Sequence, residues 1–266
     1  MTVLQAMLLG FFQGIAEFLP ISSSGHLLVF KDILAAGDVP VLFDVLLHVA
    51  TLGSVIVVFR KRVAGIIAST VRWAFRRSGP ADAENLALIP PAALATAITA
   101  VVGLAIDRID LTGYPVVVSG LFIVTAVILV AASRMKVGNA GYTELGWKHG
   151  IMVGLAQGIG VFPGISRSGI TISAGLASGM KRAEAGEFSF LLSIPAILGA
   201  LVLKLDDIGE LSGAVSLAPM LAAAGTSFIV GIAALLTLMP LVRKGKLAWF
   251  SLYLIPAGIA GILFFA

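Results

Sequence analysis

Long apolar runs separated by short polar stretches predict six membrane-spanning helices in this chain. A helix needs about 20 apolar residues to cross a bilayer, and fewer where the bilayer is locally thin. The runs are continuous and do not alternate at every second position, which favours helices over strands. The runs that reach or approach the required length are 42–59, 86–106, 115–132, 185–203, 214–241 and 247–265.

Two further apolar segments, 1–36 and 145–180, are interrupted midway by Pro, Gly and Ser residues. The interruptions fall at 20–25 and 163–169. A broken helix at membrane depth is tolerated only where it is buried in protein or lines a cavity. We therefore predict that each segment forms a re-entrant helical hairpin.

The two interruptions are copies of each other. Residues 13–26 read QGIAEFLPISSSGH and residues 157–170 read QGIGVFPGISRSGI, with 8 of 14 positions identical. Such a duplication indicates two structural halves. We predict a single membrane domain over 1–266, with a first repeat at about 1–140 and a second at about 141–266.

The basic residues indicate how the two repeats are oriented. Of 18 Lys and Arg residues, 14 lie in the stretches 60–77, 134–148, 181–182 and 243–246. The opposite loops are acidic, with Asp32, Asp38, Asp107, Asp110, Asp206, Asp207 and Glu210. Cytoplasmic loops carry an excess of Lys and Arg, so the basic stretches are expected in the cytoplasm. The two hairpins then enter from opposite sides, which predicts an inverted repeat with its site near the bilayer midplane.

The composition agrees with this all-α polytopic membrane fold. Hydrophobic residues make up 59% of the chain and charged residues 12%, whereas soluble domains carry about 25% charged residues. The net charge of +4 does not indicate nucleic acid, because the basic residues lie in short loops beside apolar runs. The absence of cysteine excludes disulfides and thiolate chemistry. No Lys or Arg precedes Lys31, so we expect the N-terminal segment to belong to the mature fold.

The second copy carries the parts of a phosphate site. A glycine-rich turn that includes Gly164 can direct backbone N–H groups at an anion, and the helix that follows adds its positive end. Arg167 supplies a cationic fork suited to phosphate oxygens. The hydroxyls of Ser166, Ser168 and Thr171 add hydrogen bonds. The alternative is a helix break capped by serines, with Arg167 reaching the membrane interface.

The first copy carries candidate catalytic groups. Gln13 and Glu17 are four residues apart and share a helix face, where their oxygens can face a metal ion or a reacting group. Ser22, Ser23, Ser24 and His26 follow in the turn. A hydroxyl near a histidine and a carboxylate can support nucleophilic catalysis, with His26 as base or as nucleophile. Alternatively, Glu17 and His26 form a buried structural pair.

Asp44 and His48 are weaker candidates. They lie one helical turn apart at the predicted outer end of a membrane span. They are expected either to line the entrance of the cavity or to form a solvated helix end.

Several motifs resemble those of the bacterial undecaprenyl pyrophosphate phosphatases of the bacitracin-resistance type. They are QGIAE at 13–17, FLPISSSGH at 18–26, PGISRSGIT at 163–171 and FSFLLSIPA at 188–196. Chain length and the two-repeat plan also agree, so the resemblance covers the whole chain.

The resemblance implies hydrolysis of a C55 polyprenyl pyrophosphate to the monophosphate and phosphate, supported by Mg²⁺ or Ca²⁺. This reaction recycles the cell-wall lipid carrier in the cytoplasmic (inner) membrane. Arg167 and the hydroxyls would hold the pyrophosphate, and Glu17 would bind metal or orient the attack. His26 and Ser23 would supply the nucleophile and its base, in either order. The family pattern permits Gln13, but its neutral side chain argues against a metal site built from two carboxylates.

The competing class is a transporter or flippase of polyprenyl phosphate, since inverted repeats with broken helices are transporter architecture. The lipid substrate and the bilayer are the expected partners in both cases. The oligomeric state stays open, with a homodimer as one option.

Overall fold

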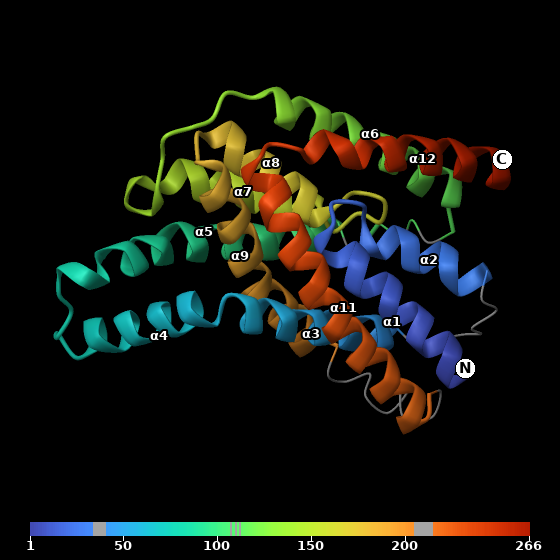
Figure 1. The fold of residues 1–266 in the computed structure, drawn as a ribbon, viewed down its shortest axis with the longest axis horizontal. Helices are drawn as coiled ribbons and strands as arrows, with labels where there is room; N and C mark the ends of the chain where they lie inside the picture. Colours follow the sequence, from blue (N-terminus) through green and yellow to red (C-terminus); the bar gives the residue numbers. More distant parts are fainter. Residues whose placement is uncertain (34–40, 107, 110, 112, 205–214) are drawn as a thin grey trace.

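The structure is a computed structural model that describes the chain except for residues 34–40, 107, 110, 112 and 205–214. Its regular secondary structure, over the described residues, consists of helices (Figure 1). The α-helices are α1 (Val3–Phe18), α2 (Ser23–Ile33), α3 (Val41–Val58), α4 (Arg60–Ala74), α5 (Ala83–Ile106), α6 (Pro115–Arg134), α7 (Trp147–Ile159), α8 (Arg167–Ser178), α9 (Arg182–Leu203), α11 (Leu217–Arg243) and α12 (Ser251–Phe265). Short 3₁₀ helices are η1 (Pro80–Asp82), η2 (Tyr142–Glu144) and η4 (Leu247–Phe250).

The helices long and apolar enough to cross a bilayer are α5, α6, α9, α11 and α12. The pair α3 and α4 makes a sixth if it is counted as one span bent by 82°. The five long helices and α3 coincide with the six predicted apolar runs, whereas α4 lies beyond the predicted run 42–59. The chain is therefore a polytopic helical membrane protein, as its sequence predicts.

Both predicted hairpins are helix–break–helix units. α1 and α2 have 16 and 11 residues, and α7 and α8 have 13 and 12, so each is shorter than a membrane-spanning helix. α1 ends where Leu19 turns extended, because the residue before a proline is excluded from helical geometry by the Pro20 ring. The helices of each hairpin pack against each other. The re-entrant path, the domain halves and their inverted orientation stay predictions.

The two halves of the chain are interlocked by helix packing. α1 packs along α11, α7 packs along α5, and α6 runs side by side with α12 (Figure 1). One hydrophobic cluster contains Phe18 of α1, Phe188 of α9 and Leu235 of α11, each at most 2% exposed. The hairpin helices are therefore held in the centre of the protein by spans from the other half.

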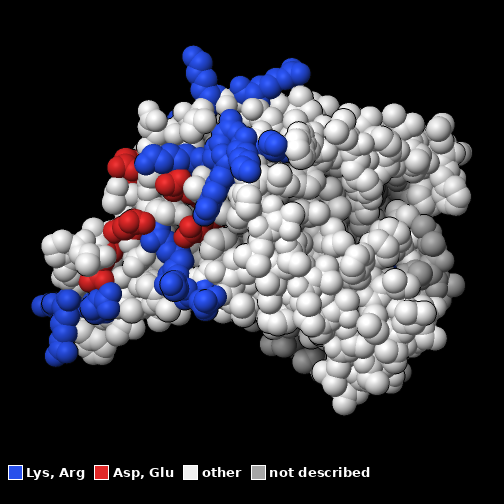
Figure 2. Space-filling model, in the orientation of Figure 1, with Lys and Arg blue, Asp and Glu red and all other residues white. Residues whose placement is uncertain are grey.

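Charged side chains gather on the left side of the face shown in Figure 2, which is the side where α4, α5 and α7 lie in Figure 1. The stretch 60–77 forms α4 and the turn that follows it. This segregation agrees with the basic side predicted from sequence. Of the acidic residues predicted on the other side, six lie outside the described residues: Asp38, Asp107, Asp110, Asp206, Asp207 and Glu210.

We predict that Gly14→Val destabilises the protein. A Cβ at Gly14 would lie 2.8 Å from the carbonyl oxygen of Ser227 and 2.9 Å from the Cβ of Val230, so α1 and α11 would have to separate. Overpacking of this kind costs about 1–3 kcal/mol. The matched control is Gly120→Val in α6, where a Cβ meets nothing within 4 Å. Thermal unfolding in detergent should show a lower midpoint for Gly14→Val than for the control, and equal midpoints would contradict the close α1–α11 contact.

Candidate active site

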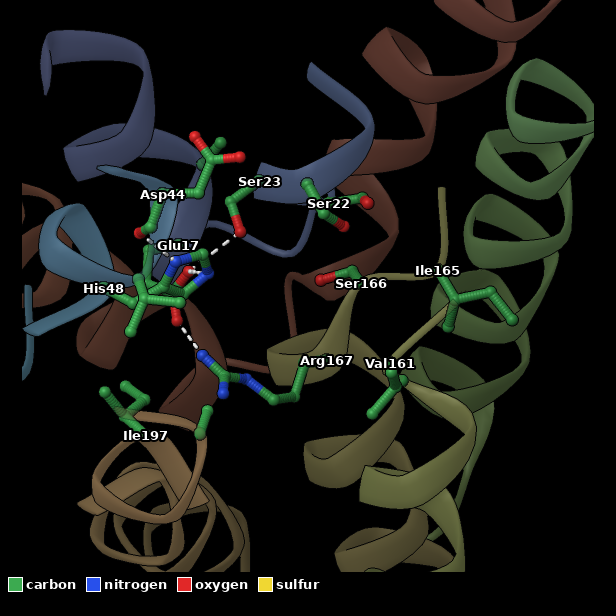
Figure 3. A pocket seen from close by; sticks show the side chains of 15 residues that line it. Glu17, Ser22, Ser23, Asp44, His48, Val161, Ile165, Ser166, Arg167 and Ile197 are labelled. Carbon is green, nitrogen blue, oxygen red and sulfur yellow. Dashed lines mark hydrogen bonds and ion pairs between the residues drawn. The ribbon is translucent and has the colours of Figure 1, made fainter. Parts of the chain in front are cut away.

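A cavity of about 310 Å³ lies between the two hairpins, α3 and α9 (Figure 3). Residues from the turns before α2 and before α8 line it, so both copies of the duplicated sequence contribute. The lining residues are Ala16, Glu17, Ser22, Ser23, Ser24, Asp44, Val45, His48, Gly160, Val161, Ile165, Ser166, Arg167, Ile197 and Ala200.

Two serines at equivalent positions of the copies accept equivalent hydrogen bonds, although their backbones differ, with φ of 71° at Ser22 and −76° at Ser166. Ser166 is the N-cap of α8 and accepts a hydrogen bond from the backbone N–H of Gly169 at 3.1 Å. Ser22 accepts from the N–H of Gly25, the equivalent glycine, at 3.4 Å. The Ser22 hydroxyl also accepts from the N–H of Gly164 at 3.0 Å. Ser22 therefore connects the two turns across the repeats.

The turn before α8 requires glycine at position 164. The φ angle of Gly164 is 94°, and a Cβ there would lie 2.7 Å from the Cβ of Leu121. Thr125 of α6 fixes the turn, since its hydroxyl donates to the carbonyl of Gly164 at 3.0 Å and accepts from the N–H of Ser166 at 3.1 Å. Gly164 shapes the turn but does not line the cavity.

The N-terminal ends of α2 and α8 border the cavity. Ser23 and Ser24 begin α2, and Arg167 begins α8. The first N–H groups of a helix lack partners within the helix and carry partial positive charge. Two helix N-termini beside a guanidinium form a site suited to an anion with several oxygens, such as a phosphate.

Glu17 connects both hairpins and α3. Its side chain is 3% exposed, and its Oε1 forms an ion pair with Nη2 of Arg167. Its Oε2 accepts hydrogen bonds from Nε2 of Gln13 at 3.0 Å and from the Ser23 hydroxyl at 2.8 Å. Nε2 of His48 lies 3.2 Å from the same oxygen. Figure 3 shows Ser23, His48 and Arg167 around this carboxylate.

His48 therefore lines the cavity, which decides between the two alternatives left by the sequence. Its Nδ1 lies 2.7 Å from the backbone carbonyl of Asp44. Because a carbonyl only accepts, Nδ1 carries a hydrogen, and Nε2 then faces a second acceptor, the Glu17 carboxylate. The His48–Glu17 contact consequently requires a shared proton. Asp44 lies on the same wall and forms an ion pair with Lys31 at 2.7 Å.

Most of the predicted site residues are brought together. Those that line the cavity are Glu17, Ser22, Ser23, Ser24, Ser166 and Arg167. Gln13 is fully buried and reaches the site only through Glu17. Their catalytic and binding roles stay predictions.

Two predicted substrate ligands, Ser168 and Thr171, face away from the main cavity. The Ser168 hydroxyl donates to the backbone carbonyl of Phe18 at 3.0 Å. The Thr171 hydroxyl donates to the carbonyl of Arg167 at 2.8 Å and contacts Ser189. Both line a void of about 10 Å³ on the other side of the Glu17–Arg167 pair. In this structure they support the hairpins rather than contact the cavity.

His26 does not meet Ser23 and Glu17 as the sequence predicts. Its Nδ1 lies 2.8 Å from the carbonyl of Ser22 and its Nε2 lies 2.6 Å from the hydroxyl of Tyr253. The imidazole stacks on Phe122 with ring centroids 4.8 Å apart. It borders a separate, largely apolar pocket of about 340 Å³. Both ring nitrogens are thus engaged outside the candidate active site.

The arrangement around Glu17 does not fit a resident Mg²⁺ or Ca²⁺ ion. An ionised carboxylate offers about four lone-pair positions, and four donor groups from Arg167, Gln13, Ser23 and His48 already surround Glu17. Over the part of the chain that the structure describes, no three His, Cys, Asp or Glu side chains are grouped to hold a metal. A cation on Glu17 would have to displace these donors, so no step below passes through one.

The fold and the cavity define a class, a polytopic helical membrane protein with a polar cavity between two helical hairpins. The family model of bacitracin resistance protein BacA matches residues 6–260, and the chain belongs to this family. An undecaprenyl-diphosphatase of Treponema denticola is 45% identical, over 100% of this chain and 98% of its own length. A protein of the same name from Carboxydothermus hydrogenoformans is 38% identical, over 97% of this chain and 96% of its own length. Another from Borrelia recurrentis is 36% identical, over 95% of this chain and 95% of its own length. The family resemblance in the sequence is thus confirmed.

We predict that the protein alone holds no divalent cation on Glu17. Purified protein titrated with Mn²⁺ in the absence of substrate should leave the electron paramagnetic resonance signal of free Mn²⁺ undiminished, because both oxygens of the carboxylate already accept from donors of the protein. The control is Glu17→Gln, which should give the same titration. Stoichiometric Mn²⁺ uptake by the parent protein that Glu17→Gln removes would contradict this description of the site.

Proposed function

We propose that this protein is an integral membrane phosphatase of the cytoplasmic (inner) membrane. It hydrolyses undecaprenyl pyrophosphate to undecaprenyl phosphate and inorganic phosphate, which recycles the cell-wall lipid carrier. The observation that carries the proposal is the contact of Ser23, Glu17 and Arg167 at the ends of two helices. The name carried by the similar proteins supports a hydrolase over a transporter.

Arg167 and the two helix N-termini bind the pyrophosphate in this proposal. A guanidinium has five N–H donors, so Arg167 can contact phosphate oxygens while one nitrogen stays paired with Glu17. The hydroxyls of Ser22, Ser24 and Ser166 also line the cavity and can donate to these oxygens. Phosphoryl transfer depends mainly on positioning and on neutralisation of charge, which these groups supply.

Ser23 is the proposed nucleophile, because its hydroxyl lies in the cavity and donates to Glu17, whereas both nitrogens of His26 are engaged elsewhere. The Ser23 oxygen attacks the terminal phosphorus, and its proton passes to Glu17. The bond from that phosphorus to the bridging oxygen breaks, and undecaprenyl phosphate leaves. Water then hydrolyses the phosphoserine to inorganic phosphate, and Ser23 regains a proton. The Mg²⁺ or Ca²⁺ implied by the resemblance would arrive on the pyrophosphate and neutralise part of its charge.

Release of phosphate from farnesyl or undecaprenyl pyrophosphate by the purified protein tests the proposal. We predict that Ser23→Ala lowers kcat by at least about 10³-fold and keeps substrate binding. Arg167→Ala should lower kcat/KM by about 10²–10³-fold, because the phosphate charge loses its cation. The control is Ser24→Ala, one residue further along the same cavity, which should change kcat by less than about tenfold, the effect of one hydrogen bond. Absence of release by the folded parent would favour the transporter, and full turnover by Ser23→Ala would remove the serine nucleophile.

His48 takes part in the site as a hydrogen-bond donor that positions Glu17. We predict that His48→Ala lowers kcat about tenfold to hundredfold, which is the effect of losing one hydrogen bond to a charged group. His48→Gln should stay within about threefold of the parent, since an amide N–H can still donate to the carboxylate. KM should change little in both variants, because His48 is not proposed to bind phosphate. Equal losses of kcat for the two substitutions would contradict the positioning role.

A further inference from the structure

A second large cavity, of about 450 Å³, lies where α3 ends, α4 begins and α11 ends. This region belongs to the end of the molecule where basic side chains gather (Figure 2). It is separate from the candidate active site and shares no lining residue with it. The lining residues are Val58, Phe59, Arg60, Lys61, Arg62, Glu187, Leu236, Met239, Pro240 and Arg243.

The cavity carries more positive than negative charge. Its lining includes four cationic side chains and a single carboxylate, that of Glu187. The charge of Arg62 is already compensated by two ion pairs, from its Nε to Oε1 of Glu187 at 3.0 Å and from its Nη2 to Oε1 of Glu84 at 2.8 Å. The side chains of Lys61 and Arg243 are exposed and have no ion pair or hydrogen bond with any described residue. Arg60 donates to the backbone carbonyl of Val57 at 3.1 Å, so Lys61 and Arg243 are the two cations that keep all their side-chain donors for an anionic ligand.

The other wall of the cavity is apolar and reaches the lipid-facing surface. Leu236 is 57% exposed on α11, a helix that is long and apolar enough to span the membrane. Met239 and Phe59 continue this wall inward. Arg243 is the last residue of α11, so the cationic side lies where the apolar span ends. Basic residues at the end of an apolar span are typical of the level of the lipid headgroups.

We propose that this cavity binds an anionic phospholipid of the leaflet on the basic side, with its phosphate on Lys61 and Arg243 and an acyl chain along Leu236. Basic pockets between membrane helices are suited to such headgroups. The apolar wall distinguishes a lipid from free phosphate, because a free anion gains nothing from it. The site does not depend on the proposed function.

Calorimetric titration of the detergent-solubilised protein with dioctanoyl phosphatidylglycerol at physiological salt tests the site. Lys61→Gln/Arg243→Gln should weaken binding about thirtyfold, and Lys61→Gln alone about fivefold. The control is Arg76→Gln/Arg77→Gln, which removes the same charge just beyond the other end of α4 and should stay within about threefold of the parent. Phosphate release should be unchanged in all three variants.

Two further ligands separate the alternatives. Dioctanoyl phosphatidylcholine and inorganic phosphate should both bind at least about tenfold more weakly than phosphatidylglycerol. Equal binding of phosphatidylcholine would show that headgroup charge is not recognised. Equal binding of inorganic phosphate would indicate a site for free anions. Either result, or parent-like binding by the folded Lys61→Gln and double variants, would overturn the proposal.

Discussion

The ion pair between Glu17 and Arg167 is the interaction on which the site depends. Each charge alone is costly inside an apolar membrane protein. Together they join α1 of one hairpin to the first residue of α8 in the other. Removal of one partner from a buried pair typically costs about 3–5 kcal/mol, because the remaining charge is left without compensation. The relative position of the two hairpins, and hence the shape of the cavity, is therefore coupled to the charge state of the site.

The two copies share a hydrogen bond between a serine and a glycine but differ in chemistry. Ser22 and Ser166 occupy equivalent positions and cap their turns through equivalent glycine N–H groups. Ser23, by contrast, stands where the second copy has Arg167, and Glu17 stands where the second copy has Val161. Neither copy alone holds the proposed nucleophile, the proposed base and the proposed phosphate-binding cation. The site requires both copies, and the two differences that introduce its charges, Glu17 in place of Val161 and Arg167 in place of Ser23, lie at positions that line the cavity.

The membrane-spanning helices could be predicted from hydropathy, and the breaks in the two hairpins could be predicted from their helix-breaking residues. The convergence of Glu17, Ser23 and Arg167 could be predicted because buried charges need partners. The direction in which individual side chains point could not be predicted from the sequence. His26 lies one turn after Ser23, yet its partners are Phe122 and Tyr253 from distant helices. His48 reaches Glu17 because α3 packs beside α1, and no local spacing encodes that contact. A motif rich in hydroxyl residues likewise does not show where each hydroxyl points. Ser168 was therefore predicted to bind substrate, whereas its hydroxyl donates to a backbone carbonyl.

In the proposed reaction, the same ion pair couples proton transfer from Ser23 to the binding of phosphate by Arg167. In the resting site, the Glu17 carboxylate faces both Arg167 and His48, and its negative charge limits the attraction that Arg167 exerts on phosphate. When Glu17 accepts the proton of Ser23, the carboxylate becomes neutral and Arg167 loses its counter-charge. The phosphoryl group then becomes the nearest anion to the guanidinium just as the serine oxygen attacks it. Because the helices hold these groups in place beforehand, little reorganisation accompanies this transfer of charge, and electrostatic stabilisation of the transition state is most effective under that condition.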